Sequence, residues 1–315
     1  MRKIIYSFLL ISFTACGQTT TNKINSDIQN SKTSKHINIP GTRLYIIPPP
    51  GFIVSKTFLG LQKGENSMIN IMDLIGGNFN TNTATFNKEE FEKKGAKVFD
   101  FKGINVNGYP AKFISVQGDA TTKSYELVFG DTTFTAMVMT IYPINDEKTG
   151  NDILNSLNSI YYDKSKKIDP FETANFSLDE TVSKFKFFQY NSNLYVYTVN
   201  GKDDPTNHNA PVVLVSQLPK DNTMTAKSIA EMMISKSQQY GFSNPELKNI
   251  STEQINGYET YQIEEYGQIQ GINTLIYYCV TTHLDKAITI QGIAKSDIEI
   301  NLSDFKKLAQ TIKIK

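Results

Sequence analysis

Residues suited to metal binding and to nucleophilic catalysis are scarce in this sequence. The 315 residues include three histidines, two cysteines and no tryptophan. A histidine-based metal site needs at least two converging imidazoles, and no two of these histidines are spaced i, i+4 along the chain. The sequence therefore predicts no cofactor and indicates no enzyme activity.

Cysteine is also too rare for a disulfide framework. Cys279 lies in the apolar, strand-like run 275–280 and is expected to be a buried small hydrophobic residue. A strand rises about 3.3 Å per residue, which places His283 roughly 13 Å from Cys279, too far for a thiol and its base. A catalytic pair is therefore not expected.

An excess of charge of either sign is absent as well. The chain carries 32 Lys and Arg against 31 Asp and Glu, a formal net charge of +1. Nucleic-acid binding needs a concentrated basic face, so no nucleic-acid partner is expected. Neither a glycine-rich phosphate loop nor a Gly-x-Ser-x-Gly nucleophile elbow occurs.

At the N-terminus, a short basic segment is followed by an apolar run. Arg2 and Lys3 precede the apolar stretch 4–13, which is too short to span a bilayer of roughly 30 Å. Thr14 and Ala15 then precede Cys16, and polar residues follow. This segment resembles the lipobox of bacterial lipoproteins, which implies a signal peptide over residues 1–15 and lipidation of Cys16.

The lipobox resemblance implies attachment to the cell envelope through a lipid anchor, because two or more acyl chains anchor a protein stably. Gly17, in place of aspartate, resembles lipoproteins that leave the inner membrane, so we expect the outer membrane of a Gram-negative bacterium. An ordinary secretory signal with an incidental Cys16, or a short uncleaved anchor, is the alternative. Residues 16–36 are almost entirely polar and are expected to form a flexible tether.

The body of the chain contains an internal repeat. Gly108-Tyr109 and Gly257-Tyr258 lie 149 residues apart, and three strand-like segments and an amphipathic helix follow each pair. Upstream, residues 44–47 are matched to 194–197, 68–72 to 212–216, and a helix at 87–97 to one at 225–240. The repeat predicts two tandem domains, 37–164 and 165–315, with the boundary in the polar stretch 163–169.

Each copy is expected to be an α+β domain, an antiparallel sheet flanked by helices on both faces. The last helix has an apolar face that is expected to pack on a sheet, formed by Phe305, Leu308, Ala309 and Ile312. Strands that are apolar on both faces are expected to have helices packed on both. Capping pairs are predicted at Asn87 with Glu90 and at Thr149 with Asp152.

The first copy resembles the PsbP/Mog1-like family of α/β/α sandwiches. The resemblance rests on the corner Pro48-Pro49-Pro50-Gly51-Phe52, the strand opened by residues 106–109, the mid-domain helix 87–97 and the closing helix with Ile153 and Leu154. The second copy has residues 198–202 in place of the proline corner. The resemblance implies an α/β/α fold and non-catalytic protein binding.

One loop could hold a cation. Asp203, Asp204 and His208 crowd a polar segment, which makes them weak metal-site candidates, although the EF-hand pattern is absent and a solvated turn is the competing interpretation. Glu264 and Glu265 are expected on opposite sheet faces as strand-surface charge, so they form no carboxylate dyad. The many tyrosines of the second copy are expected to pack rather than to bind.

These observations favour a lipid-anchored envelope protein that binds a protein partner or assists assembly without catalysis. The alternative is a small-ligand carrier or enzyme with its site in the cleft between the domains, where ligand pockets often lie. A deep polar cleft with converging carboxylates would favour the alternative, and a shallow aromatic patch would favour partner binding.

Overall fold

The computed structural model describes residues 23–315 except 57, 205, 208, 221–222, 238 and 240. The signal peptide and Cys16 lie outside the described residues. The fold is mainly β-sheet with a few helices, as the aromatic and β-branched composition predicts. Strands β1 to β11 pair only among themselves, as do β12 to β20, and we name these two groups the first and the second domain.

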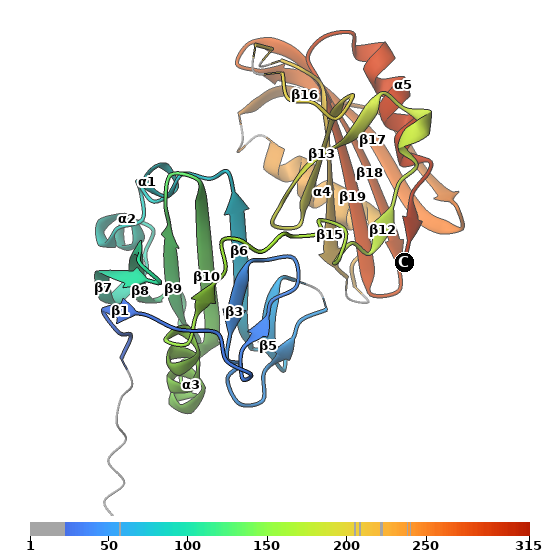
Figure 1. Ribbon diagram of the computed structural model, residues 1–315. Helices are drawn as coiled ribbons and strands as arrows, with labels where there is room; N and C mark the ends of the chain where they lie inside the picture. Colours follow the sequence, from blue (N-terminus) through green and yellow to red (C-terminus); the bar gives the residue numbers. More distant parts are fainter. Residues whose placement is uncertain are drawn as a thin grey trace, which may run out of the picture.

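The first domain contains an eight-stranded sheet (Figure 1). Its order is β1 (Asp27–Ile28), β7 (Lys97–Val106), β8 (Tyr109–Gln117), β9 (Thr122–Gly130), β10 (Phe134–Pro143), β6 (Ser67–Ile75), β5 (Gly60–Lys63) and β4 (Ile53–Val54). Only β1 pairs in parallel. A small sheet of β11 (Tyr161–Tyr162), β3 (Leu44–Ile46) and β2 (Ile37–Asn38) accompanies it, together with α1 (Phe79–Asn82), α2 (Lys88–Lys93) and α3 (Glu147–Leu157).

The second domain contains a seven-stranded antiparallel sheet. Its order is β13 (Phe185–Asn191), β14 (Leu194–Val199), β15 (Val212–Pro219), β19 (Lys286–Ala294), β18 (Ile272–His283), β17 (Tyr258–Ile269) and β16 (Phe242–Ile255). Two helices, α4 (Ala226–Ser237) and α5 (Ile298–Ala309), and a short helix η1 (Glu180–Val182) accompany it. Strand β12 (Phe176–Ser177) pairs with β20 (Lys313–Ile314).

Alternating strand residues feed separate cores. In β18, Leu275, Tyr277 and Cys279 share a cluster with residues of α5, whereas Ile276, Tyr278 and Val280 share another with residues of α4. Successive strand side chains point to opposite faces, so the two clusters lie on opposite sides of the second sheet. The first sheet divides likewise between a cluster with α3 and one with α1 and α2.

The two sheets share one strand order over six strands. The series β7-β8-β9-β10-β6-β5 corresponds to β16-β17-β18-β19-β15-β14. The corresponding turns Asn107-Gly108 and Asn256-Gly257 have left-handed backbone at both residues, as a type I′ hairpin requires. By sheet position the partner of residues 194–197 is β5, so their predicted match to residues 44–47 was wrong. Residues 44–46 instead belong to the three-stranded sheet.

The flexible tether predicted over residues 16–36 is contradicted over residues 23–36. Ile24 and Ile28 are buried in the first core, and β1 pairs with β7. The Asn30 amide donates to the carbonyl oxygens of Asn158 and Ile160. The two buried isoleucines, the pairing of β1 with β7 and side-chain hydrogen bonds together hold this polar segment against the domain. Among the described residues no helix is long and apolar enough to cross a membrane.

Side chains cap the N-termini of α2 and α3, one of them a different residue from the one predicted. The Asn87 side chain accepts a hydrogen bond from the Glu90 N–H, as predicted. The predicted pair of Thr149 and Asp152 was wrong, because α3 begins one turn earlier. Asp146 is its N-cap and accepts from the Thr149 N–H at 2.9 Å.

Candidate functional site

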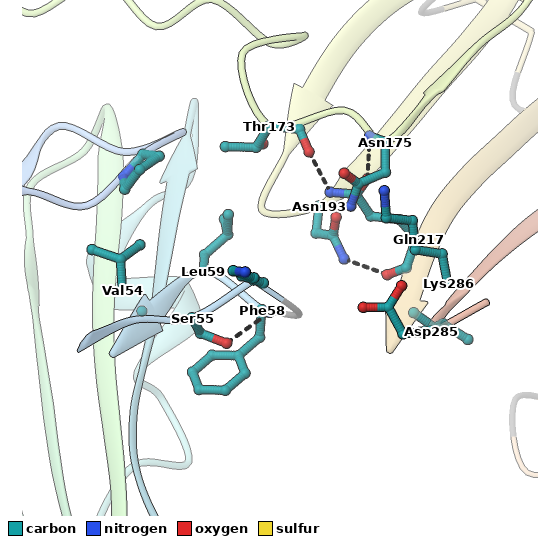
Figure 2. A pocket seen from close by; sticks show the side chains of 14 residues that line it. Val54, Ser55, Phe58, Leu59, Thr173, Asn175, Asn193, Gln217, Asp285 and Lys286 are labelled. Atoms are coloured by element: carbon teal, nitrogen blue, oxygen red, sulfur yellow. Dashed lines mark hydrogen bonds between the residues drawn. The ribbon is translucent and has the colours of Figure 1, made fainter. Parts of the chain in front are cut away.

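A pocket of about 450 Å³ lies between the two domains. Figure 2 shows side chains of the first domain on one side of it and side chains of the second domain on the other. Pockets of this volume commonly hold small ligands or short chain segments. The first domain contributes Pro40, Val54, Ser55, Lys56, Phe58, Leu59 and Gly60, and the second contributes Thr173, Asn175, Asn193, Gln217, Leu218, Asp285 and Lys286.

The wall from the first domain is largely apolar. It is formed by β4 and the loop into β5, and includes Val54, Phe58 and Leu59. The carbonyl oxygen of Leu59 accepts a hydrogen bond from the Ile71 N–H at 2.8 Å, which fixes the loop against β6. Gly60 allows this approach, because a Cβ there would lie 1.9 Å from the Ile69 carbonyl oxygen.

The wall from the second domain is polar and internally bonded. The Gln217 amide accepts from the Asn175 N–H at 2.8 Å and donates to the Thr173 carbonyl oxygen at 2.9 Å. The Asn193 amide nitrogen donates to the Gln217 carbonyl oxygen at 2.7 Å (Figure 2). Gln217 is therefore committed to the wall itself. The Asn193 Oδ1 atom is buried and accepts no hydrogen bond from the described residues.

Three buried hydroxyl groups accompany this wall. They belong to Thr173, Tyr190 and Tyr195, and the Thr173 hydroxyl interacts with both tyrosine hydroxyls. Burial raises the pKa of both tyrosines, so both stay protonated at neutral pH. A Cβ added at Gly41 would lie 3.0 Å from the Tyr190 hydroxyl and 3.4 Å from Thr173 Oγ1, so the hydroxyls abut the first domain.

Charged groups are few around the pocket. Lys56, Asp285 and Lys286 line it, and Asp285 and Lys286 belong to the hairpin between β18 and β19. The Lys286 ammonium also donates to the carbonyl oxygen of Lys315. Asp285 is the only carboxylate among the described lining residues, so the converging carboxylates that would favour an enzyme site do not appear there.

The domains are joined beside the pocket by one hydrogen bond from β6. The Asp73 N–H donates to Ser192 Oγ, in the turn between β13 and β14, at 3.0 Å. The Asp73 carboxylate forms a buried two-point pair with the Arg43 guanidinium, with N–O distances of 2.9 and 2.6 Å. The Tyr162 hydroxyl donates to the same carboxylate at 2.8 Å. Asp73, which makes the contact with the second domain, is thus also held by Arg43 and Tyr162 of the first domain.

The predicted cation-site residues are not gathered around a cavity. Asp203 and Asp204 are exposed, and His208 lies outside the described residues. Asp204 accepts hydrogen bonds from the side chain and the N–H of Thr206, and these bonds lower its pKa. Within residues 23–315, as far as they are described, no three His, Cys, Asp or Glu side chains converge in a possible metal site.

Glu264 and Glu265 lie on opposite sheet faces as predicted, but their expected role as surface charge was wrong. Both are buried, at 1% and 0% exposure. Glu264 bonds to Lys306 of α5 at 2.6 Å, and also to Asn249 and Tyr266. Glu265 accepts from Ser237 at 3.0 Å and Tyr278 at 2.8 Å. Lys306 belongs to α5 and Ser237 to α4, so each carboxyl contacts a residue of a different helix.

Cys279 is a fully buried free cysteine, as the sequence predicts. Burial raises the pKa of its thiol to about 12, so the reactive thiolate is not populated at neutral pH. Tyr195, Tyr197, Tyr277 and Tyr278 are also buried, which confirms that these tyrosines pack in the cores.

The pocket-lining residues were missed by sequence reasoning. They come from segments scattered between Pro40 and Lys286, and none belongs to a recognisable motif. Only the alternative prediction, a ligand or enzyme site in the cleft between the domains, pointed to this region, and it named no residue. The exposure of Ile53 and Val54, at 64% and 38%, is visible only in the folded structure, so the sequence offered no signal for this wall.

Comparison with known proteins gives structural likeness only. No family model and no curated protein matches the chain. The solution structure of CyanoP, a PsbP protein of Synechocystis, matches at 15% identity over 49% of this chain and 100% of its own, with a TM-score of 0.32. LpqN, involved in cell envelope biogenesis of Mycobacterium tuberculosis, matches at 12% identity over 44% and 78%, with a TM-score of 0.29.

A third solved structure matches most of the chain. The T6SS immunity protein TplEi of Pseudomonas aeruginosa is 10% identical over 89% of this chain and 97% of its own, with a TM-score of 0.34. These likenesses leave the function to be argued from the residues of the chain itself.

Proposed function

We propose that this chain is a non-enzymatic binding protein of the cell envelope that holds a segment of a partner protein in the pocket between its two domains. The pocket carries this proposal, because an apolar wall from one domain faces a polar wall from the other. Such a pair of walls suits an amphipathic segment. The Asn193 Oδ1 atom supplies an unpartnered acceptor beside it.

Binding without catalysis is supported by the positions of the reactive groups. The Cys279 thiol is sealed in the second core, and Glu264 and Glu265 are separated by the sheet. The described pocket lining offers amides, hydroxyls, two ammonium groups and one carboxylate. These groups suit hydrogen-bonded recognition, whereas a nucleophile needs an adjacent base.

We further propose that each domain is a helix–sheet–helix sandwich of PsbP/Mog1-like type, and that Cys16 carries the lipid that holds both at the outer membrane. The repeated strand order and the cores on both sheet faces support the first proposal. The basic head, short apolar run and Thr14-Ala15-Cys16 sequence support the second.

Photocrosslinking in cells tests the binding function. Phe58, in the pocket wall, is replaced by p-benzoylphenylalanine in the full-length chain, and protein adducts are identified by mass spectrometry after irradiation. Phe99 on β7 is the matched control, since it is 46% exposed and lies six strand positions from β4, about 29 Å at 4.8 Å per strand.

A discrete protein adduct from position 58 that is missing from position 99 is the expected result. The adduct should weaken when Asn193→Ala is added, because the opposite wall then loses its free acceptor. Equal adducts from both positions, or none from position 58, would contradict a partner-binding pocket.

A further inference from the structure

The first-domain wall of the pocket includes the free edge of a sheet. Strand β4 ends the eight-stranded sheet and pairs with β5 alone among the described strands. The β5 side of the first sheet faces the second domain (Figure 1). An unpaired strand edge presents backbone donors and acceptors that can pair with an added strand.

The hydrogen-bond pattern of β4 identifies which peptide groups are free. The Ser55 N–H donates to the Gly60 carbonyl oxygen at 2.9 Å, and Ile53 and Val54 lie opposite Gln62 and Leu61. In an antiparallel pair, bonded and non-bonded residue pairs alternate, so Val54 and Leu61 are a non-bonded pair. The N–H and C=O of Val54 therefore point away from β5, toward the outer edge.

The opposite wall adds an acceptor that no described residue uses. Asn193 Oδ1 is buried and accepts no hydrogen bond from the described residues. A buried acceptor without a hydrogen bond destabilises the protein, so this atom favours a bound donor. An extended peptide carries N–H and C=O groups that alternate along its two edges. One edge can pair with the backbone of β4 while the other donates to the acceptor on the opposite wall.

We propose that the pocket binds its partner by strand addition: an extended peptide segment pairs with the outer edge of β4 through Val54. Its other edge donates to Asn193 Oδ1, and an apolar side chain packs on Val54 and Leu59. Lys56 and Lys286 against one carboxylate, Asp285, favour a segment with an acidic residue. This proposal rests on the proposed binding function and names the mode of recognition.

The test uses random linear 12-residue peptides displayed on phage, selected on the full-length chain in detergent. A selected peptide is then synthesised, and its dissociation constant is measured for wild type, Val54→Pro and Val54→Ala. Proline removes one N–H, which points outward and takes no part in the β4–β5 ladder, and proline is tolerated at such edge positions. Alanine keeps the N–H and shortens the side chain.

Strand addition predicts that Val54→Pro weakens binding at least about tenfold, whereas Val54→Ala weakens it less than about threefold. A second measurement needs no variant: amide hydrogen exchange at Val54 should slow when the peptide binds. It keeps the proposal testable if Val54→Pro fails to fold.

Two outcomes would overturn strand addition while leaving the binding function intact. Peptide binding that is indifferent to Val54→Pro, with unchanged exchange at Val54, would mean recognition by side chains alone. A failure to select any peptide that competes with the partner crosslinked at position 58 would mean that the occupant is not an extended peptide. Absence of any crosslink at position 58 would instead remove the binding function itself.

Discussion

At the scale of single residues, Glu264 and Glu265 show two treatments of a buried carboxyl on adjacent positions of one strand. Burial raises the pKa of Glu264, but hydrogen bonds from Lys306, Asn249 and Tyr266 outweigh it, and the net pKa is lowered. Glu265 has no cation among its described partners, so burial dominates and its pKa is raised. As pH rises from acid to neutral, Glu264 therefore adds to the stability of the fold, whereas the contribution of Glu265 to stability decreases.

We expect Glu265→Gln to stabilise the protein at neutral pH. A folded-state pKa raised above the unfolded value of about 4.3 means that Glu265 contributes most stability below that value and loses it as pH rises through the folded pKa. Glutamine imitates the protonated form and can keep both hydroxyl partners. Urea unfolding over a pH series should show the variant more stable at pH 7, with the difference vanishing near pH 4.

Glu264→Gln is the matched control and should change stability in the opposite direction. Because the pKa of Glu264 is lowered, its ionised carboxylate stabilises the fold at pH values above the ordinary carboxyl pKa. This stabilisation is lost as pH falls through the folded-state pKa. The Glu264→Gln variant should therefore be less stable than wild type at pH 7. A loss of stability at pH 7 in both variants would contradict the assignment of a raised pKa to Glu265.

The sequence predicted the faces of these residues but not their burial. A side-chain period of two is a local property of a strand, so it separates Glu264 from Glu265 without further information. Burial depends on elements distant in the chain: Ser237 ends α4, and Lys306 lies on α5. The sequence around residue 264 therefore contains no pattern that predicts contact with these distant residues.

At the scale of elements, the closing helix of the second domain packs directly on a glycine of the sheet. A Cβ at Gly292 of β19 would lie 2.4 Å from the Phe305 ring of α5. Gly292 carries no left-handed backbone, so its role is to leave space for the helix. The prediction of a helix stripe containing Phe305 was right, but the contact of its ring with a glycine required the packed structure.

We expect Gly292→Ala to lower the free energy of unfolding by about 1–3 kcal/mol, because overpacking forces α5 away from the sheet. Gly103→Ala on β7 is the matched control, since its nearest neighbour would be a carbonyl oxygen at 4.0 Å. That change should stay within about 0.5 kcal/mol. Equal losses in urea unfolding would show that the cost comes from the strand backbone and not from α5.

The Arg43–Asp73 pair fastens one element to another. Arg43 precedes β3 of the three-stranded sheet, Asp73 lies on β6 of the large sheet, and both are nearly fully buried. Asp73→Asn leaves a buried guanidinium without its counter-charge, which typically costs about 3–5 kcal/mol. Asp152→Asn, in the exposed pair with Lys148, should cost less than about 0.5 kcal/mol. Thermal or urea unfolding of both variants measures the contrast.

The elements themselves were largely accessible from the sequence, whereas their pairing was not. The Asn107-Gly108 and Asn256-Gly257 turns form local hairpins, and the strand-like segments predicted after them are present as β8 to β10 and β17 to β19. The match of residues 44–47 to residues 194–197 failed because an isolated apolar strand carries no signal for the strand it will pair with. The tether prediction failed for the same reason, since burial of Ile24 and Ile28 depends on the core of the first domain.

At the scale of the whole molecule, the docking of residues 23–36 shortens the reach of the predicted lipid anchor. The Asn158 amide donates to the Lys23 carbonyl oxygen and its Oδ1 accepts from the Asn25 N–H, so the chain is held to the first domain from residue 23. Eight residue steps separate Cys16 from the buried Ile24, and a fully extended chain spans at most about 29 Å over them. A lipid on Cys16 would thus keep the first domain near the bilayer surface.

We expect Cys16→Ser to release the protein from the membrane fraction, because the lipid is the only attachment that the sequence predicts. Cys279→Ala is the matched control: it removes the other cysteine, which is buried in the second core, and should leave the protein membrane-bound. Cell fractionation with radiolabelled palmitate reports both attachment and acylation. Retention of unlabelled Cys16→Ser in the membrane would point to an uncleaved N-terminal anchor, whose intact mass would still include residues 1–15. Loss of both the label and membrane retention in Cys16→Ser, but not in Cys279→Ala, would support a lipid anchor at Cys16. Because Cys16 lies at most about 29 Å along the chain from the buried Ile24, that anchor would keep the first domain and its wall of the pocket close to the membrane.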